Sequence, residues 1–433
     1  MFCQLEVLRH CFPSSVRHIL EELPESLDET YERILREVRK PNQGHAHRLL
    51  QCMVVAARPL RVEELAEVLS FDFTAEGIPK MNLGWRWEDQ EAAVLSACSS
   101  LVIIVKDGDS RIVQFSHFSV KEFLTADRLA EPIRDVSRYH IRLEGAHTIL
   151  AQACLGVLLR LDDRVDRDNI KDFPLAPYAA QYWSTHARFD NASSCIKDGM
   201  ECLFDADKPH FATWLWIFDE DQYGHSMPTM CPEKPRAVPL YHAARLGSRN
   251  LAEHLIAGHP EHVNARDTGP NKATPMYAAA GGGYTDILSL LLQHGGDVNF
   301  KNPCRFSLLH KASFAGKLEA GQFLLDCGLD INAQPDDGWT ALFYAVSERH
   351  IEFARMLLKR GARTDISQES SGKTALHLAV EGGNIQAVRL LLEHGADVNA
   401  RNKDGWTPSQ TGSQQGRDEI VELLSEYGAE SVK

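Results

Sequence analysis

The sequence predicts a mainly α-helical protein in which an N-terminal helical and winged-helix module precedes an α-solenoid of repeats. Three observations support this prediction. Helical apolar spacing dominates the N-terminal half, one pair of β-runs interrupts it, and a segment of about 33 residues recurs through the C-terminal half. We expect a helical segment at 1–57, a winged helix at 58–130, a helical spacer at 131–235 and a repeat array at 236–433.

The first 98 residues predict a series of helices. Two are expected within 1–40 and a third around 44–57, where Arg58-Pro59 ends it because proline has no amide hydrogen to donate. Two more are expected at 62–69 and near 89–98. The second helix shows apolar residues at helical spacing, which are Leu27, Tyr31, Ile34, Leu35 and Val38.

A β-hairpin is expected after these helices. Two apolar β-runs, 100–105 and 112–116, flank a polar turn around Asp107-Gly108. A further helical segment, 117–124, follows the second run. Helices, then a hairpin, then a closing helix are the order of a winged helix.

Five segments of this half resemble the C-terminal part of NACHT-type signal-transduction ATPases, especially fungal NOD-like receptors that carry repeat arrays. They are CQLEVLRHC (3–11), LPESLDETYERIL (23–35), RPLRVEELAEVL (58–69), FSHFSVKEFL (115–124) and PLAPYAAQYWSTHARF (174–189). The resemblance implies that the nucleotide-binding core would lie before residue 1, so we expect no ATP hydrolysis by this chain alone. It would then act as the regulatory half of a nucleotide switch, with the NTPase core upstream or in another chain.

The resemblance also implies a role for one histidine. In the family, a winged-helix histidine touches bound ADP, and His117 matches its position. The alternative is a residue at a helix start that packs within its own domain. The same type of winged helix occurs in inositol deacylases, but this chain shows no serine-hydrolase constellation to carry that activity.

The C-terminal half repeats a Thr-Pro-Leu-His-like tetrapeptide. After a first copy at Val238, the copies start at Thr274, Ser307, Thr340, Thr374 and Thr407, with separations of 33, 33, 34 and 33 residues. This signature, with the apolar stretch that follows each copy, is similar to that of ankyrin repeats. The Thr-Pro start suits a helix N-terminus, and glycines at 295, 328, 361 and 395 suit helix ends. In the last copy Ser409 and Gln410 replace the Leu and His, as expected for a polar terminal cap.

The ankyrin resemblance implies a protein partner held on a concave surface of hairpin tips and first helices. The implied partner-binding residues are Arg305, Phe306, Trp339, Lys373 and Trp406 at the tips, and Phe314, Glu348, Glu381 and Gln414 after the first helices. Trp339 and Trp406 occupy equivalent positions. They are either aromatic anchors for the partner or hairpin residues that lie flat on their neighbours.

Several local patterns suggest chemistry, but a structural role explains each one better. Ser371-Gly372-Lys373-Thr374 lacks the first glycine of a phosphate loop, and Gly224–Pro228 lacks the strand before a nucleophile elbow. His254, His259 and His262 lack the spacing of a zinc helix. The acidic run at 162–168 lacks the glycine of a calcium loop. The signature histidines His310 and His377 are expected to form hydrogen bonds within the hairpin stack.

Composition excludes further classes. A net charge of −14 makes nucleic acid a poor partner, and acidic residues crowd the expected winged helix: Glu63, Glu64, Glu67, Glu88, Asp89 and Glu91. Ten cysteines without a Cys-x-x-Cys pair indicate a reducing compartment. No signal peptide or long apolar run is present. We therefore expect a cytoplasmic, non-enzymatic scaffold or receptor without a cofactor, a metal or a membrane partner.

Overall fold

The computed structural model describes residues 26–74, 77–131, 135–162, 164–166, 168–187, 193–205, 208–223, 238–269 and 271–430. It contains two compact units, Met1–Pro235 and Arg236–Lys433. The first helix expected within 1–40 and the Gly224–Pro228 segment lie outside the described residues. The described secondary structure is mostly helical, as predicted.

The N-terminal unit begins with α3 (Leu27–Glu37), the second of the helices expected within 1–40. The Ser26 hydroxyl accepts a hydrogen bond from the Glu29 amide at 3.2 Å and caps the helix. Tyr31, Ile34 and Leu35 are buried at the predicted spacing. Leu27 is 41% exposed, because it lies in the first turn, before the face that packs on α7 (Ser119–Thr125).

A winged helix follows α3. Helices α4 (Gln43–Val55), α5 (Val62–Glu67) and α6 (Gln90–Cys98) pack together ahead of the hairpin of β3 (Val102–Asp107) and β4 (Ser110–Phe115). The strands pair from Val102↔Phe115 to Asp107↔Ser110, so the turn contains only Gly108, at φ 58°, and Asp109. An isolated antiparallel bridge pairs Arg61, just before α5, with Ile112 of β4, so this segment lies alongside the hairpin. Since α4 packs on α6, the packed unit extends across residue 58.

Four helices of the spacer complete this unit: α8 (Leu143–Leu158), α9 (Ala176–His186), α10 (Ser193–Leu203) and α11 (His210–Tyr223). Helix α8 packs on both α4 and α9. An aromatic core joins α9 to α11, where Trp183 lies 6.0 Å from Phe204 and 6.1 Å from Trp214 between ring centres. A small antiparallel pair, β1 (Phe71–Asp72) with β2 (Lys80–Met81), was not expected from the sequence.

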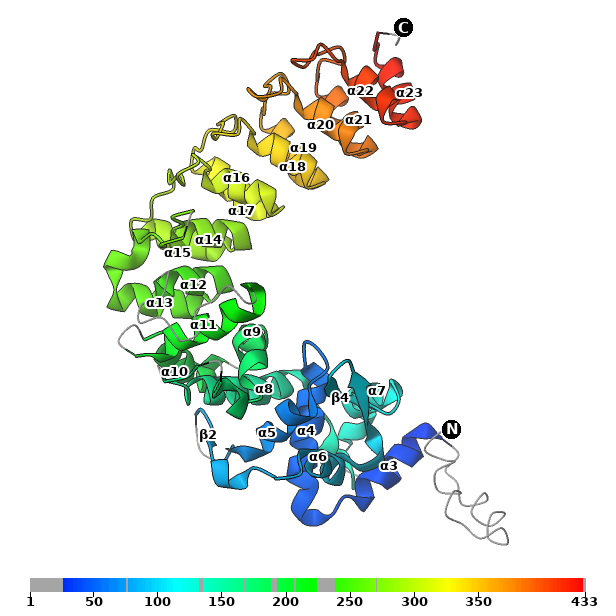
Figure 1. Ribbon diagram of the computed structural model, residues 1–433, viewed down its shortest axis with the longest axis vertical. Helices are drawn as coiled ribbons and strands as arrows, with labels where there is room; N and C mark the ends of the chain where they lie inside the picture. The colour runs from blue at the N-terminus through cyan, green and yellow to red at the C-terminus, as the bar shows by residue number, and fades with distance from the viewer. Residues whose placement is uncertain are drawn as a thin grey trace. The chain divides into compact units, whose positions relative to one another are not determined.

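The C-terminal unit is a stack of helix pairs, as predicted. Each first helix packs on the next first helix, and each second helix on the next second helix. Figure 1 shows the pairs in single file, with the hairpins before α16, α18, α20 and α22 on one side. The pairs are α12 (Pro239–Leu246) and α13 (Arg249–Gly258), α14 (Pro275–Gly282) and α15 (Thr285–Gln293), α16 (Leu308–Phe314) and α17 (Leu318–Asp326), α18 (Ala341–Ser347) and α19 (Ile351–Lys359), α20 (Ala375–Glu381) and α21 (Ile385–Glu393), and α22 (Pro408–Gln414) and α23 (Asp418–Glu426).

Local residue chemistry explains the boundaries of these helices. The Thr274 hydroxyl caps α14 by accepting from the Tyr277 amide at 3.3 Å. The predicted glycines follow the second helices with φ between 79° and 89°, a conformation that side chains oppose: Gly295, Gly328, Gly361 and Gly395. Small residues where the first helices pack on one another are fully buried: Ala279, Ala312, Ala345 and Ala379.

Candidate functional site

The two signature histidines, His310 and His377, each tie their repeat to the hairpin of the next one, as predicted. His310 Nδ1 accepts from the Ser307 amide at 3.2 Å, and its Nε2 donates to the Ala333 carbonyl at 2.9 Å. His377 does the same with the Thr374 amide and the Trp406 carbonyl, at 3.2 and 3.1 Å. Burial lowers the pKa of His310 to about 4, so the ring stays neutral at neutral pH. The hairpin tips are therefore anchored to the helices behind them.

We define the recognition face as the hairpin tips of the array together with the exposed residues of the first helices. The predicted tip residues Arg305, Phe306, Trp339, Lys373 and Trp406 lie just before a first helix. Phe314, Glu381 and Gln414 are the last residues of α16, α20 and α22. Glu348 is one residue beyond the end of α18, so Ser347 is the equivalent of those three.

The structure brings three of the predicted residues into one aromatic cluster. Phe306 and Trp339 lie 5.0 and 5.3 Å from the ring of Tyr344, and Phe314 lies 6.2 Å from it, measured between ring centres. Tyr277 of the preceding repeat lies 6.5 Å from Phe306. Phe314 is 46% exposed, whereas Tyr344 is buried, with only 8% of its surface exposed. Rings from three successive repeats thus form a continuous apolar surface with an accessible edge.

One cation lies on this cluster. The Lys311 ammonium is 5.6 Å from the centre of the Tyr277 ring and 5.8 Å from that of Phe314. Its aliphatic stem crosses Gly281, where a Cβ atom would lie 2.6 Å from the lysine Cε. Burial, with a smaller contribution from Arg245, lowers the pKa of Lys311. Among the described residues, no hydrogen-bond acceptor or carboxylate pairs with this ammonium.

The remaining predicted residues lie apart from the cluster. Lys373 and Glu381 pair with each other at 2.7 Å within one repeat. Trp406 is 37% exposed, and Gln414 is exposed at the end of α22. Trp339 packs on Phe343 and Tyr344, so the two equivalent tryptophans differ: one is half-buried among aromatic rings and the other is open to solvent.

Sequence reasoning missed Tyr277, Lys311 and Tyr344. Lys311 and Tyr344 stand at the same register, four residues after Ser307 and Thr340. Tyr277 stands three residues after Thr274, where His310 and His377 stand in other repeats. A comparison of repeats at these two registers could have found them, because the residue type there changes from one repeat to the next.

His117 lies at the start of α7. Its Nδ1 accepts from the Ser119 amide at 3.3 Å and lies 2.7 Å from the Ser119 hydroxyl, which is 2.8 Å from the hydroxyl of Tyr31. A ring whose Nδ1 accepts an amide hydrogen carries its proton on Nε2. The Nε2 atom has no partner among the described residues, and the neighbouring Phe118 is 73% exposed.

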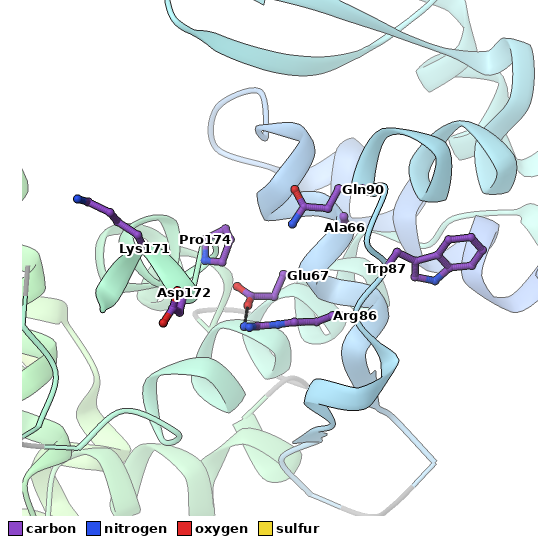
Figure 2. A pocket seen from close by; sticks show the side chains of 8 residues that line it. All are labelled: Ala66, Glu67, Arg86, Trp87, Gln90, Lys171, Asp172 and Pro174. Atoms are coloured by element: carbon purple, nitrogen blue, oxygen red, sulfur yellow. Dashed lines mark hydrogen bonds and ion pairs between the residues drawn. The ribbon is translucent and has the colours of Figure 1, made fainter. Parts of the chain in front are cut away.

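A cleft of about 240 Å³ lies between the winged helix and the segment before α9. Figure 2 shows Glu67 and Arg86 joined by an ion pair in the wall of the cleft that the winged helix forms. The buried Glu67 carboxylate also accepts from the Leu175 amide at 2.7 Å, at the start of α9. Although burial raises the pKa of Glu67, these two partners oppose that shift. Because the buried Glu67 carboxylate is already satisfied by Arg86 and the Leu175 amide, we interpret this arrangement as a structural junction.

Two further sequence patterns can be placed. His259, Glu261 and His262 bring their donor atoms within 4.8 Å of one another, whereas His254 is not in this group. Glu261 is 64% exposed and His259 is 43% exposed, and within the described residues no second partner orients either imidazole. Residues 368–373 form a hairpin turn, closed by the Gln368 amide donating to the Lys373 carbonyl at 2.8 Å. This turn confirms the structural interpretation of Ser371–Thr374.

Comparisons with known families agree with this architecture. The family described as "Ankyrin repeats (3 copies)" matches 240–335, 276–368 and 361–433. The family described as "GPI inositol-deacylase, winged helix domain" matches 31–133. The chain therefore carries an ankyrin-repeat array and, ahead of it, a segment that matches a winged-helix domain. Among the described residues, no helix is long and apolar enough to span a bilayer.

Individual relatives share parts of the chain. Azaphilone pigments biosynthesis cluster protein L of Monascus ruber is 32% identical over 64% of this chain and 61% of its own length. Protein phosphatase 1 regulatory subunit 12A of Rattus norvegicus is 36% identical over 22% of this chain and 9% of its own. This chain thus spans less than two thirds of either relative. The ankyrin domain of Bcl-3, an IkappaB family member, covers 46% of this chain at 28% identity, with a TM-score of 0.42.

Proposed function

We propose that this protein is a non-catalytic cytoplasmic scaffold or receptor that binds a protein partner through the recognition face of its ankyrin repeats. The proposal rests on the aromatic cluster, in which rings from three successive repeats form an apolar surface with an exposed edge. Aromatic residues dominate the energetics of protein interfaces. Ankyrin-repeat relatives include a protein named as a phosphatase regulatory subunit, which is a binding role.

Affinity capture with matched variants tests this proposal. The full chain and the variant Phe314→Ser/Trp406→Ser are each used to capture proteins from the source cell, with quantitative mass spectrometry. Both side chains are exposed, so the fold is retained and circular dichroism checks it. Tyr427→Ser is the control, because Tyr427 is 40% exposed beyond the end of α23. We expect a loss of about tenfold or more in captured partner for the double variant only. Equal capture by all three proteins contradicts the proposal.

We propose a second candidate, that this chain is the regulatory half of a NACHT-type nucleotide switch whose NTPase core lies upstream or in another chain. The observation that favours it is the orientation of His117, whose Nδ1 is held by Ser119. Its Nε2–H is thus left to donate to a ligand. Adding an NTPase core in trans and measuring ADP binding tests this candidate. We expect His117→Ala to weaken ADP binding, and equal affinity contradicts the switch role without affecting the scaffold proposal.

A further inference from the structure

One backbone position at the hairpin tips is left-handed in five successive repeats. It is occupied by glycine at Gly338, Gly372 and Gly405, with φ of 75°, 71° and 80°. In the two preceding repeats the same position holds Lys272 and Arg305, with φ of 45° and 61°. A side chain disfavours this conformation because its Cβ atom approaches the following carbonyl oxygen. Two basic residues therefore stand where glycine is the conformationally easier choice.

A third non-glycine residue with a left-handed backbone, Arg349, has a structural explanation. Arg349 has φ of 61° and stands in register with Gly316 and Gly383, whose φ values are 65° and 63°. Its guanidinium donates to the Gly382 carbonyl of the next repeat at 2.5 Å, so its side chain ties two repeats together. By contrast, the side chains of Lys272 and Arg305 make no hydrogen bond or ion pair within the described residues. A contact between repeats thus explains why Arg349 occupies a left-handed position. Among the described residues, no such contact explains Lys272 and Arg305 at the hairpin tips.

Lys311 supplies a third cation without a hydrogen-bond or ion-pair partner among the described residues, on the first helix of the repeat that carries Arg305. Its ammonium is held over two aromatic rings and its stem lies on Gly281, so little side-chain freedom remains to be lost on binding. Phe306 follows Arg305 directly, and Phe314 lies beside Lys311 with nearly half of its surface exposed. Positive charges without a carboxylate partner in the described part of the chain therefore lie beside accessible aromatic surface in the second repeat (α14 and α15) and the third repeat (α16 and α17).

The next two repeats differ in charge. The Asp337 carboxylate accepts from the Trp339 amide at 2.9 Å and from the Tyr344 hydroxyl. Asp336 and Glu348 are exposed in the same repeat, and Lys373 is neutralised by Glu381 in the one after it. Lys272, Arg305 and Lys311 thus lie toward one end of the aromatic cluster, and the acidic Asp336, Asp337 and Glu348 belong to the repeat at its other end.

We infer that the recognition face of the second and third repeats binds an acidic protein segment whose carboxylates pair with Lys272, Arg305 and Lys311. An apolar side chain next to those carboxylates packs on Phe306 and Phe314. The inference rests on the proposed scaffold function and specifies the chemistry of its partner. A nucleic acid fits less well, because its continuous phosphate charge would meet Asp336 and Glu348 as well as the three cations.

Peptide display on the full chain tests the inference. Short random peptides are selected on the wild-type protein, and one enriched peptide is synthesised for fluorescence polarisation. The test variant is Lys272→Gly/Arg305→Gly/Lys311→Met, in which glycine suits the left-handed tips and methionine keeps the stem on Gly281. The control, Lys359→Gln/Arg360→Gln/Arg389→Gln, removes the same charge from exposed residues on or next to second helices, outside the recognition face. Circular dichroism confirms the fold of both variants.

We expect enriched peptides to carry Asp or Glu beside an aromatic or aliphatic residue. The triple variant should weaken binding of such a peptide about 30-fold, and the control less than about twofold. Enriched peptides without acidic residues, or equal binding to the test variant, overturn the inference but leave the scaffold proposal standing. Failure to enrich any peptide contradicts both. Tighter binding of a single-stranded DNA oligonucleotide than of any enriched peptide, lost in the test variant, also overturns the assignment of the partner.

Discussion

Buried polar groups serve different purposes in the N-terminal unit and in the ankyrin array. In the N-terminal unit, the Glu67 carboxylate accepts from the Leu175 amide across 108 residues of sequence and pairs with Arg86. In the array, a buried Thr or Ser stands before each first helix from α14 onward, at Thr274, Ser307, Thr340, Thr374 and Thr407. The stability of the array therefore comes from similar contacts repeated between neighbouring repeats. The stability of the N-terminal unit depends on individual contacts that each occur once.

The largest effect is expected in the aromatic core of the N-terminal unit. Trp183 is 1% exposed and packs on Phe204 and Trp214. Trp183→Ala should lower the free energy of unfolding by about 4 kcal/mol, because it removes a large buried side chain and leaves a cavity. Hydrogen exchange measured by mass spectrometry should show the loss in residues 143–223 and unchanged protection in the array.

Trp183→Phe is the matched control. The Trp183 indole nitrogen is buried without a hydrogen-bond partner among the described residues, so phenylalanine keeps most of the packing and removes an unsatisfied donor. We expect it to retain most of the stability. Equal loss of protection in both units after Trp183→Ala would contradict the contrast between them.

Acidification should weaken both units through buried histidines. Burial lowers the pKa of His186 and of His310 to about 4, below the ordinary 6.5. The unfolded chain binds the proton first, so each histidine stabilises the fold fully above pH 6.5. That contribution, about 3 kcal/mol each, is lost as the pH falls toward 4. Chemical denaturation at several pH values measures this dependence.

The two histidines should act in different places. His186 lies 2.9 Å from the Tyr178 hydroxyl and 2.9 Å from Nδ1 of His147, within the N-terminal unit. Hydrogen exchange at low pH should therefore rise around α8 and α9 for one site and around α16 and α18 for the other. His186→Gln should remove the first change and leave the second. A pH-independent stability between 6.5 and 4 would refute both assignments.

A smaller effect is expected from one array histidine. His377→Ala should lower the free energy of unfolding by about 2 kcal/mol, because the Thr374 amide and the Trp406 carbonyl both lose a partner. Thermal denaturation followed by circular dichroism measures it. His394 is exposed and bonds only within its own helix, so His394→Ala should cost under about 0.5 kcal/mol. Similar losses for both variants would show that the repeated histidine bonds add nothing specific.

The smallest effect is expected at the tips. Lys272→Gly/Arg305→Gly should raise the free energy of unfolding by about 0.5 kcal/mol per site, since relief of the left-handed strain exceeds the added freedom of the unfolded chain. Arg349→Gly relieves the same strain but loses the bond to the Gly382 carbonyl, so no gain is expected. Destabilisation by the tip double variant would mean that Lys272 and Arg305 have a packing role.

Much of the fold follows from local signals. The repeat period, the glycines after the second helices and the hairpin around Gly108 all depend on backbone preferences of a few residues, and each prediction is confirmed. The turn is shorter than the predicted polar segment, because Lys106 and Asp107 pair with Arg111 and Ser110. Residue type alone misplaced Ser409, which was expected in a polar cap facing water. It is 2% exposed because it occupies the buried leucine position of the signature.

The candidate site was only partly predictable. Phe306, Phe314 and Trp339 were identified as surface residues, but the sequence did not indicate that Tyr344 joins them. Glu348 was placed one residue out of register, because the position equivalent to Phe314 and Glu381, seven residues after the signature Thr340, is Ser347. Lys373 and Glu381 were treated as separate contacts, although they neutralise each other. Each difference concerns how side chains of one repeat, or of its neighbours, meet in space.

The sequence by itself determined the order of the units, the repeat boundaries and the acidic, mainly helical character of the chain. These properties follow from composition and from short-range backbone preferences, which can be read one segment at a time. Only the tertiary structure decided which aromatic rings meet and which cations lack a partner. The physical reason is that these contacts join residues about one repeat apart, and stacking alone brings them within reach.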